Sequence, residues 1–163
     1  MMKQILLAAG LLALAAPQSV AQNASQIASA KSGKSCKDCN LFQADMSYTQ
    51  LRNVSFAGAR LRQSNFTLST MDGVNFSGSN LSISNLYGGR FTGASFKKAN
   101  LTDATLVGGS FEGSDFTGAN LTNANLSGAE MSKARGLTQQ QLNVACGDTS
   151  TQLPSGLKVQ HCR

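Results

Sequence analysis

The sequence predicts an all-β solenoid whose coils have four sides. Two regularities carry this prediction: a large apolar residue stands at every fifth position, and the kind of residue repeats every twenty positions. A small residue also stands two places before most of the large ones, so each unit of five has one large and one small inward position. The large residues are Leu41, Met46, Leu51, Phe56, Leu61, Phe66, Met71, Phe76, Leu81, Leu86, Phe91, Phe96, Leu101, Leu106, Phe111, Phe116, Leu121, Leu126 and Met131.

The five-residue period requires a turn in every unit. On a helix this spacing would spread the apolar residues over all faces, and on a strand it would alternate them between the two sides. Only a chain that turns once per unit keeps them all in one core. The last place of the unit is often glycine, which adopts the positive φ of a type II turn, and Asn53, Asp103 and Asn123 stand in for it elsewhere. The glycines are Gly58, Gly73, Gly78, Gly88, Gly93, Gly108, Gly113, Gly118 and Gly128.

The twenty-residue repeat sets the number of sides. One column contains only leucine and another only phenylalanine, which indicates that like residues stack on like in successive coils. Four units of five therefore close one coil. The columns are Leu41, Leu61, Leu81, Leu101 and Leu121, and Phe56, Phe76, Phe96 and Phe116.

These units resemble the pentapeptide-repeat family, whose consensus is A(D/N)LXX. The match is clearest at 99–103, 119–123 and 124–128, which read ANLTD, ANLTN and ANLSG. The resemblance implies a right-handed quadrilateral parallel β-helix for residues 36–133, with nearly five coils and a length of roughly 24 Å at the ~4.8 Å strand spacing. Some cytoplasmic members are described as DNA mimics that act on gyrase through an acidic rod. This chain has a formal net charge of +6, so that role does not carry over.

Residues 1–21 have the layout of a signal peptide. Lys3 is followed by an apolar run over 5–16, and Ser19-Val20-Ala21 fits the small-residue cleavage site. The apolar run is too short to span a bilayer of ~30 Å, so we expect no membrane span after cleavage. We therefore predict a bacterial protein that is periplasmic or secreted.

The segments on either side of the repeats are expected to differ. Residues 22–35 are polar, with Ile27 alone and no periodicity, and are predicted to be a flexible leader. Residues 134–163 are predicted to be a C-terminal cap made of a short helix and a loop. Thr138 and Gln141 match a capping box, and Gly147 would end a helix of about eight residues. The apolar residues of 153–159 would then cover the last coil.

Four cysteines lie in pairs at the two ends of the repeat region: Cys36 and Cys39, then Cys146 and Cys162. An exported chain favours disulfides, and three pairings are open in principle. Because a rod of roughly 24 Å separates the ends and a disulfide needs Cα atoms within about 7 Å, we predict that each pair bonds within its own end. A redox role for Cys36 and Cys39 is a minor alternative.

The sequence favours no enzyme. No nucleophile, base and orienting acid can be assembled, and the acidic residues are scattered along the rod. We therefore expect no catalytic residues and no cofactor. A metal site is disfavoured because His161 is the only histidine. Nucleic-acid binding is disfavoured as well, because the basic residues form no continuous stripe and there are no aromatic platforms.

Exposed apolar residues indicate a candidate interaction patch. Folding the chain by twenty places Tyr48 under Leu68 and Tyr87 under Val107 on one face, with Ile83 near the adjoining corner. Clustered exposed apolar residues suggest a contact surface, whereas ordinary packing of the turns is the plainer interpretation.

Three functions remain open. The first is a non-enzymatic exported scaffold or protein-interaction module, whose partner is an unknown protein or a second copy of the chain. The alternative is a binder of acidic envelope polymers such as an acidic polysaccharide, through the basic positions. The third is the redox role of the first cysteine pair.

Overall fold

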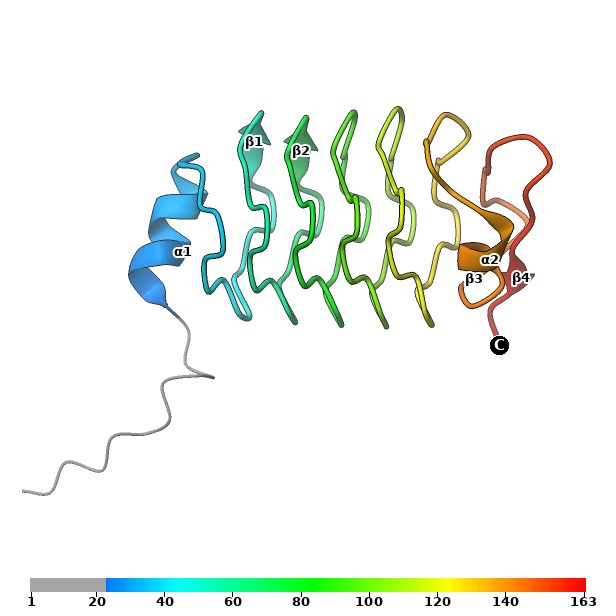
Figure 1. Ribbon diagram of the computed structural model, residues 1–163, viewed down its shortest axis with the longest axis horizontal. Helices are drawn as coiled ribbons and strands as arrows, with labels where there is room; N and C mark the ends of the chain where they lie inside the picture. Colours follow the sequence, from blue (N-terminus) through cyan, green and yellow to red (C-terminus); the bar gives the residue numbers. More distant parts are fainter. Residues whose placement is uncertain (1–22) are drawn as a thin grey trace, which may run out of the picture.

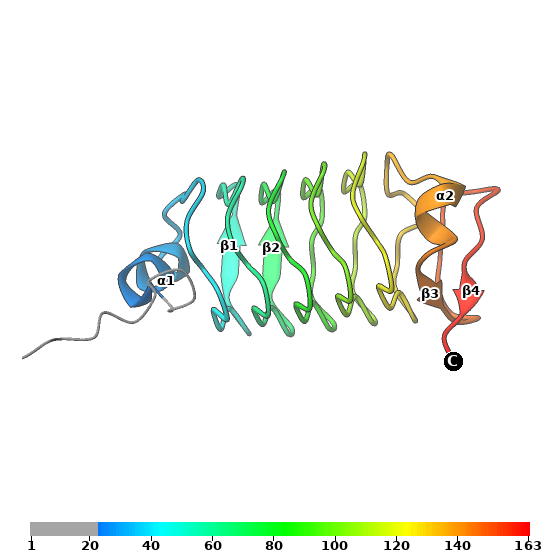
Figure 2. The ribbon, with the colours of Figure 1, turned by 60° about the horizontal axis from the view of Figure 1, so that its bottom comes forward.

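The computed structural model describes residues 23–163, so the predicted signal peptide lies outside the described residues. The repeat region winds into a rod of stacked coils, with helix α1 (Ala24–Lys31) at one end. Helix α2 (Gln139–Leu142) and strands β3 (Cys146–Gly147) and β4 (Gln160–His161) close the other end (Figure 1). Figure 2 shows the same stack after a rotation, with the coils side by side and one cap at each end.

Parallel pairing between residues twenty apart holds the coils together. Strand β1 (Gln50–Arg52) pairs with strand β2 (Thr70–Asp72), and single bridges such as Asn80↔Asn100 continue the same register along the rod. Each side of a coil is extended over only about three residues before the chain turns. Most neighbouring coils are therefore joined by single bridges rather than by longer strands. The bridges place four units of five in each coil, as the sequence predicts.

The core consists of the predicted large residues. All nineteen are at most 6% exposed. The phenylalanine columns stack as expected: ring centroids are 5.2 Å apart between Phe76 and Phe96 and 4.9 Å apart between Phe96 and Phe116. Phe91 and Phe111 stack at 5.2 Å on another side of the core. Phenylalanines twenty residues apart therefore stack on one another, because a coil of twenty residues returns the chain to the same side of the rod.

Nearly every predicted turn contains a left-handed residue. The glycines in the last place of the unit have φ between 60° and 68°, and the non-glycine residues there, including Asn53, Asp103 and Asn123, also have positive φ; Lys133 in the final unit is the exception. The polar residue before the large one closes the turn locally. For example, the Asn100 side chain accepts a hydrogen bond from the Thr102 amide at 3.1 Å. The turn prediction is confirmed.

The prediction of a flexible leader at 22–35 is wrong, because 24–31 form helix α1. The Asn23 side chain caps this helix by accepting from the Gln26 amide. Ala30 is fully buried, Ile27 packs against the core, and the Gln26 side chain accepts a hydrogen bond from the Asn40 amide at 2.8 Å. The helix therefore covers the exposed apolar end of the first coil. This contact buries the apolar residues of the segment, although its sequence pattern alone does not predict a helix.

At the other end the helix is half as long as predicted. Thr138 and Gln141 form the expected capping box, but α2 ends at Leu142. Gly147 does not end a helix; it belongs to β3 and pairs with His161 of β4. The chain leaves the helix early because the last coil still has an open edge: Cys146 bridges to Asn125 and extends the ladder. Leu153, Leu157 and Val159 then pack against the core, as expected for a lid.

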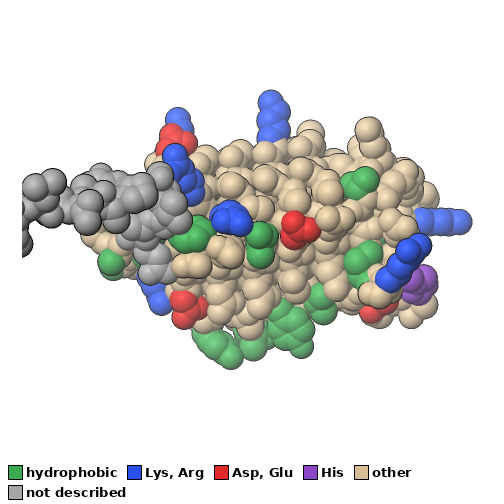
Figure 3. Space-filling model, turned by 90° about the horizontal axis from the view of Figure 1, so that it is seen from below, with side chains coloured by type: hydrophobic (Ala, Val, Ile, Leu, Met, Phe, Trp, Pro, Cys, Tyr) green, Lys and Arg blue, Asp and Glu red, His purple; other side chains and the backbone are tan. Residues whose placement is uncertain are grey.

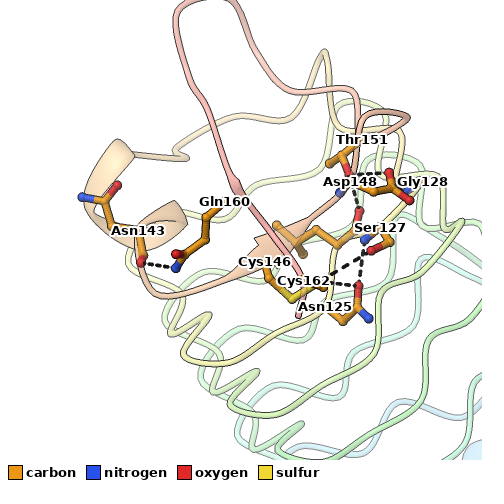
Figure 4. Close-up of a disulfide and its surroundings, with 10 residues drawn as sticks. Asn125, Ser127, Gly128, Asn143, Cys146, Asp148, Thr151, Gln160 and Cys162 are labelled. Atoms are coloured by element: carbon orange, nitrogen blue, oxygen red, sulfur yellow. Dashed lines mark hydrogen bonds between the residues drawn. A yellow bond between two sulfur atoms is a disulfide. The ribbon is translucent and has the colours of Figure 1, made fainter.

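Both predicted disulfides are present. Cys36 bonds to Cys39 with a Cα–Cα distance of 5.6 Å, and Cys146 bonds to Cys162 with a Cα–Cα distance of 4.8 Å. The second disulfide joins Cys146 of β3 to Cys162, the residue after β4, beside Asn125 and Ser127 of the preceding coil (Figure 4). It therefore fastens the lid to the rod. Within residues 23–163, no helix has the length and apolar character that crossing a membrane requires.

Candidate interaction surface

The turns form four rows along the rod, and each row receives two neighbouring residues from each coil. One row of the repeat region contains no charged residue, and we call it the apolar turn row. Its members are Ser47, Tyr48, Thr67, Leu68, Tyr87, Gly88, Val107, Gly108, Ser127 and Gly128. Each of the other three rows includes charged residues: Arg62 and Asp103 in one, Arg52, Asp72, Glu112 and Lys133 in the second, and Lys37, Asp38, Lys97 and Lys98 in the third.

The structure brings four of the five predicted patch residues together in this row. Backbone hydrogen bonds link its neighbours: the Leu68 amide donates to the Tyr87 carbonyl at 2.9 Å, and the Gly88 amide donates to the Val107 carbonyl at 2.9 Å. Tyr48 is 72% exposed, Tyr87 is 50% exposed and Leu68 is 49% exposed, while Val107 is half-buried. Figure 3 shows exposed hydrophobic side chains gathered along one edge of the rod.

Ile83 belongs to the neighbouring turn row. It is 44% exposed, and it lies four residues before Tyr87, at the other corner of the same side of the coil. It therefore lies at the border of the patch, near the adjoining corner, rather than within the apolar turn row.

These apolar residues share their positive φ with polar residues in the same place of other units, such as Gln43 and Lys98. Tyr48, Leu68 and Ile83 have φ of 56°, 53° and 59°. A left-handed conformation costs an L-residue roughly 1–2 kcal/mol, and it is especially unusual for a β-branched residue. Glycine occupies the equivalent place in many units at no such cost. The turn therefore imposes the same backbone cost on apolar and polar residues, and what distinguishes Tyr48, Leu68 and Ile83 is that large apolar side chains are exposed.

Half of the charged residues in the other three rows form ion pairs within the chain. Arg90 contacts Asp72 at 2.5 Å, Lys97 contacts Asp115 at 3.3 Å, and Lys133 contacts Glu112. The net positive charge therefore does not gather into one surface on the sides of the rod, and the sides are weaker candidates for binding an acidic polymer than the charge alone suggests.

A shallow recess of about 280 Å³ lies beside the last ion pair and is lined by Glu112, Glu130, Ser132 and Lys133. The Ser132 hydroxyl and amide donate to the Glu130 carboxylate and lower its pKa, while the hydrogen bond to Glu112 raises the pKa of Lys133. Both shifts favour the charged forms, so neither group is poised to exchange a proton near neutral pH. Among residues 23–163, no cluster of three His, Cys, Asp or Glu side chains is arranged to hold a metal ion.

The first cysteine pair lies in the first coil rather than at the start of a helix. Cys39 is buried and Cys36 is half-buried, and the Cys36 amide donates to the Ser55 carbonyl at 2.7 Å. The thiolate of a redox pair is usually stabilised by a helix N-terminus or a neighbouring cation. Helix α1 ends at Lys31, ahead of the pair, so it cannot supply that stabilisation. The surroundings suit a structural clip.

The chain belongs to the pentapeptide-repeat family: the model of pentapeptide repeats matches residues 35–73, 59–97 and 99–135, with eight copies. The solenoid is accordingly the right-handed β-helix of that family, and its members are in general non-enzymatic repeat proteins. The family resemblance seen in the sequence is thus confirmed. A comparison with curated proteins gives no match.

Several solved structures of this family are similar to the chain. A pentapeptide repeat protein from the Arabidopsis thaliana thylakoid lumen is 34% identical over 55% of this chain and 63% of its own, with a TM-score of 0.40. Rfr23 from the cyanobacterium Cyanothece 51142 is 18% identical over 79% and 97%, with a TM-score of 0.42. A pentapeptide repeat protein from Nostoc PCC 7120 is 17% identical over 86% and 93%, with a TM-score of 0.46.

Proposed function

We propose that this protein is a non-enzymatic, exported interaction module of the bacterial periplasm or cell exterior. Its rod of nearly five coils, with a short helix in the C-terminal cap, presents the apolar turn row to a protein partner. One observation carries the proposal. Tyr48 and Leu68 are large, exposed and held at positive φ in the one turn row without charge. Large apolar side chains that are exposed close together in an uncharged row are expected of a binding surface.

The capped ends support contact through the sides. Ala30 of α1 is buried against the first coil, and the Gln141 side chain of the cap donates to the Phe116 and Ala119 carbonyls of the last coil at 2.9 Å each. Open solenoid ends are the usual place for strand-to-strand association. With these backbone groups occupied, the sides of the rod remain as the surface for a partner.

Site-specific photo-crosslinking in producing cells tests this function. We expect a discrete adduct when the photoreactive residue replaces Tyr87, and none when it replaces Thr117, an exposed turn residue on the opposite side of the rod. Circular dichroism of both variants would verify that each folds. Equal adducts at both positions, or none at either, would remove the apolar turn row as the binding surface.

Binding of acidic envelope polymers is a second candidate, favoured by the basic composition. The formal charge of +6 becomes +5 when Lys3 leaves with the signal peptide, and Lys158 and Arg163 lie close together in sequence at the lid. Binding to an acidic polysaccharide would weaken as salt is raised, because salt screens exposed charges, whereas an apolar contact would not. Titration of the purified protein with such a polymer at low and high salt separates the two candidates.

A further inference from the structure

We propose that the N-terminal end of the rod binds the surface of an anionic membrane, with helix α1 and the lysines around it against the lipid headgroups. The inference goes beyond the proposed function, because it uses the end of the rod and leaves the apolar turn row free for a protein partner. In this orientation the C-terminal lid lies at the end of the rod that is farthest from the membrane (Figure 1).

The positive charge of the rod is concentrated toward this end. Residues 23–63 hold six basic and two acidic residues, a net charge of +4, whereas residues 64–163 hold seven basic and six acidic residues, a net charge of +1. The basic residues of the first part are Lys31, Lys34, Lys37, Arg52, Arg60 and Arg62, and the acidic ones are Asp38 and Asp45. A surface of opposite charge therefore attracts the N-terminal end more strongly than the rest of the rod.

Three of these lysines lie at the end itself. Lys31 is the last residue of α1, and the Lys34 amide donates to the Ser29 carbonyl of that helix at 3.2 Å. Lys37 lies in the first turn of the coil region, and the stretch 23–37 contains no acidic residue. All three lysines are exposed, and none forms an ion pair among residues 23–163. Their ammonium groups are therefore free to contact a negatively charged surface.

The lysines are spread around the end. Hydrogen bonds from Ser47, with a smaller contribution from the charge of Lys31, lower the pKa of Asp45, so Lys31 lies near Asp45. The residue after Lys37 donates its amide to the Ala57 carbonyl at 2.9 Å. Asp45 and Ala57 are twelve residues apart, which is more than half of a twenty-residue coil, so these two lysines lie on different sides of the end. Such a rim suits a flat charged surface, whereas a linear polymer is expected to follow a stripe along the rod.

Helix α1 presents only small side chains outward. Ile27 packs against the core and Ala30 is fully buried, while the exposed positions of the helix before Lys31 are Ala24, Ser25 and Ala28. No large apolar side chain of α1 is therefore available to enter the hydrocarbon of a bilayer. The contact is electrostatic, so added salt weakens it.

The strength of the contact follows from the three lysines. A basic residue close to an anionic lipid surface strengthens binding by about five-fold, so the three together contribute about a hundred-fold. The opposite end of the rod is less favourable. Its exposed basic residues, Arg135, Lys158 and Arg163, share the C-terminal cap with the acidic Asp148.

Co-sedimentation with lipid vesicles tests the proposal. The purified protein begins at Gln22, so that the predicted signal peptide cannot insert, and the vesicles are phosphatidylcholine with about one-third phosphatidylglycerol. We expect binding to these vesicles, none to pure phosphatidylcholine, and about a hundred-fold weaker binding when Lys31, Lys34 and Lys37 are all replaced by glutamine.

A variant of equal net charge provides the control. Replacing Arg135, Lys158 and Arg163 by glutamine removes three charges from the far end, about two Debye lengths or more from the membrane, and should change binding by about two-fold at most. Circular dichroism verifies that both triple variants fold. Equal losses in the two variants, or no binding to the anionic vesicles, would overturn the proposal. So would binding to soluble alginate, an acidic polysaccharide, without binding to vesicles.

The orientation can be measured directly, because the chain contains no tryptophan. Ala28→Trp labels the exposed face of α1, and Ser155→Trp labels an exposed position of the lid. On anionic vesicles that contain brominated lipid, we expect fluorescence to fall by about two-fold or more in Ala28→Trp and to stay unchanged in Ser155→Trp, because a rod of roughly 24 Å separates the two indoles. Equal quenching at both positions contradicts end-on binding.

The outcomes also separate this inference from the proposed function. If a photoreactive residue in place of Tyr87 yields an adduct in cells while the purified protein ignores anionic vesicles, the interaction module stands and membrane contact is refuted. If the vesicles bind as described and Tyr87 gives no adduct, the membrane contact stands and the apolar turn row is refuted as a binding surface.

Discussion

Ala129 occupies the position of the next coil that is equivalent to Gly109, so replacing Gly109 with alanine tests how tightly the core is packed around it. An added Cβ at Gly109 would lie 2.8 Å from Cε2 and 3.0 Å from Cζ of Phe111, and 3.2 Å from the Leu106 carbonyl oxygen. Phe111 cannot move aside easily, since it is stacked on Phe91 at 5.2 Å and meets Phe116 edge-on at 5.6 Å. Overpacking of this kind costs typically 1–3 kcal/mol.

We therefore expect Gly109→Ala to lower the melting temperature by about 3–12 °C, taking about 3–4 °C per kcal/mol for a domain of this size. Thermal unfolding followed by circular dichroism measures the change. In the next coil the equivalent positions hold Ala129 and Met131, both fully buried. The double variant Gly109→Ala with Phe111→Met recreates that pair.

The two changes should not add. Residues in contact usually show coupling of about 0.5–3 kcal/mol, and here the flexible methionine should relieve the clash, so the double variant loses less stability than the sum of the singles. An unchanged melting temperature in Gly109→Ala, or strict additivity in the double variant, would refute the reasoning that this glycine is required by the phenylalanine stack.

Three further predictions concern the two caps. Replacing Cys146 and Cys162 together by serine removes a disulfide with a sequence separation of 16, which contributes about 3 kcal/mol in the loop-entropy model. We expect the melting temperature to fall by about 10 °C. An unchanged melting temperature would show that the disulfide does not stabilise the lid. The hydrogen bond from the Ser150 hydroxyl, supported by backbone amides, lowers the pKa of Asp148 from 3.8 to about 2. A lowered carboxyl pKa contributes stability above the unfolded value, and this stability is lost as pH falls through the folded value. The protection of the lid amides, measured as exchange relative to the intrinsic rate at each pH, should therefore fall between about pH 4 and pH 2, and Asp148→Asn should remove that loss. Finally, Ile27→Ser should lower the melting temperature by about 3–7 °C, because the side chain of Ile27 packs against the core. The matched variant Ile83→Ser, at an exposed position, should leave the melting temperature nearly unchanged. Equal effects of the two substitutions would contradict the capping role of α1.

Several features of the candidate surface could be read from the sequence because the repeat is so regular. Once the coil was known to contain twenty residues, Tyr48 and Leu68 had to share a corner, and Tyr87 and Val107 the adjoining position. What the spacing could not show is how far each side chain is exposed. Tyr48 is 72% exposed, whereas Val107 is half-buried, and this difference depends on how the neighbouring coils pack.

The caps were harder to predict because they do not repeat. The segment around Ile27 has one large apolar residue and no periodicity, so its composition alone indicates disorder. Helix α1 forms because the first coil offers an apolar mouth for Ala30 and Ile27, and because the Asn40 amide donates to the Gln26 side chain. The prediction that Gly147 ends a helix is wrong for a similar reason. Glycine after a capping box is a common helix end, but here the unpaired edge of the last coil at Asn125 pairs with Cys146, and the chain forms β3.

The sequence by itself determined the four-sided coil, the identity of the core and the turns, and which cysteines pair, because each follows from a period that every unit repeats. Only the tertiary structure decided how the rod ends and which side chains its surface exposes. A cap forms according to the edge it covers rather than its own pattern, and the exposure of Tyr48 and Leu68 depends on how the neighbouring coils pack. Local periodicity specifies a repeating interior, whereas ends and exposed corners depend on contacts that the period does not encode.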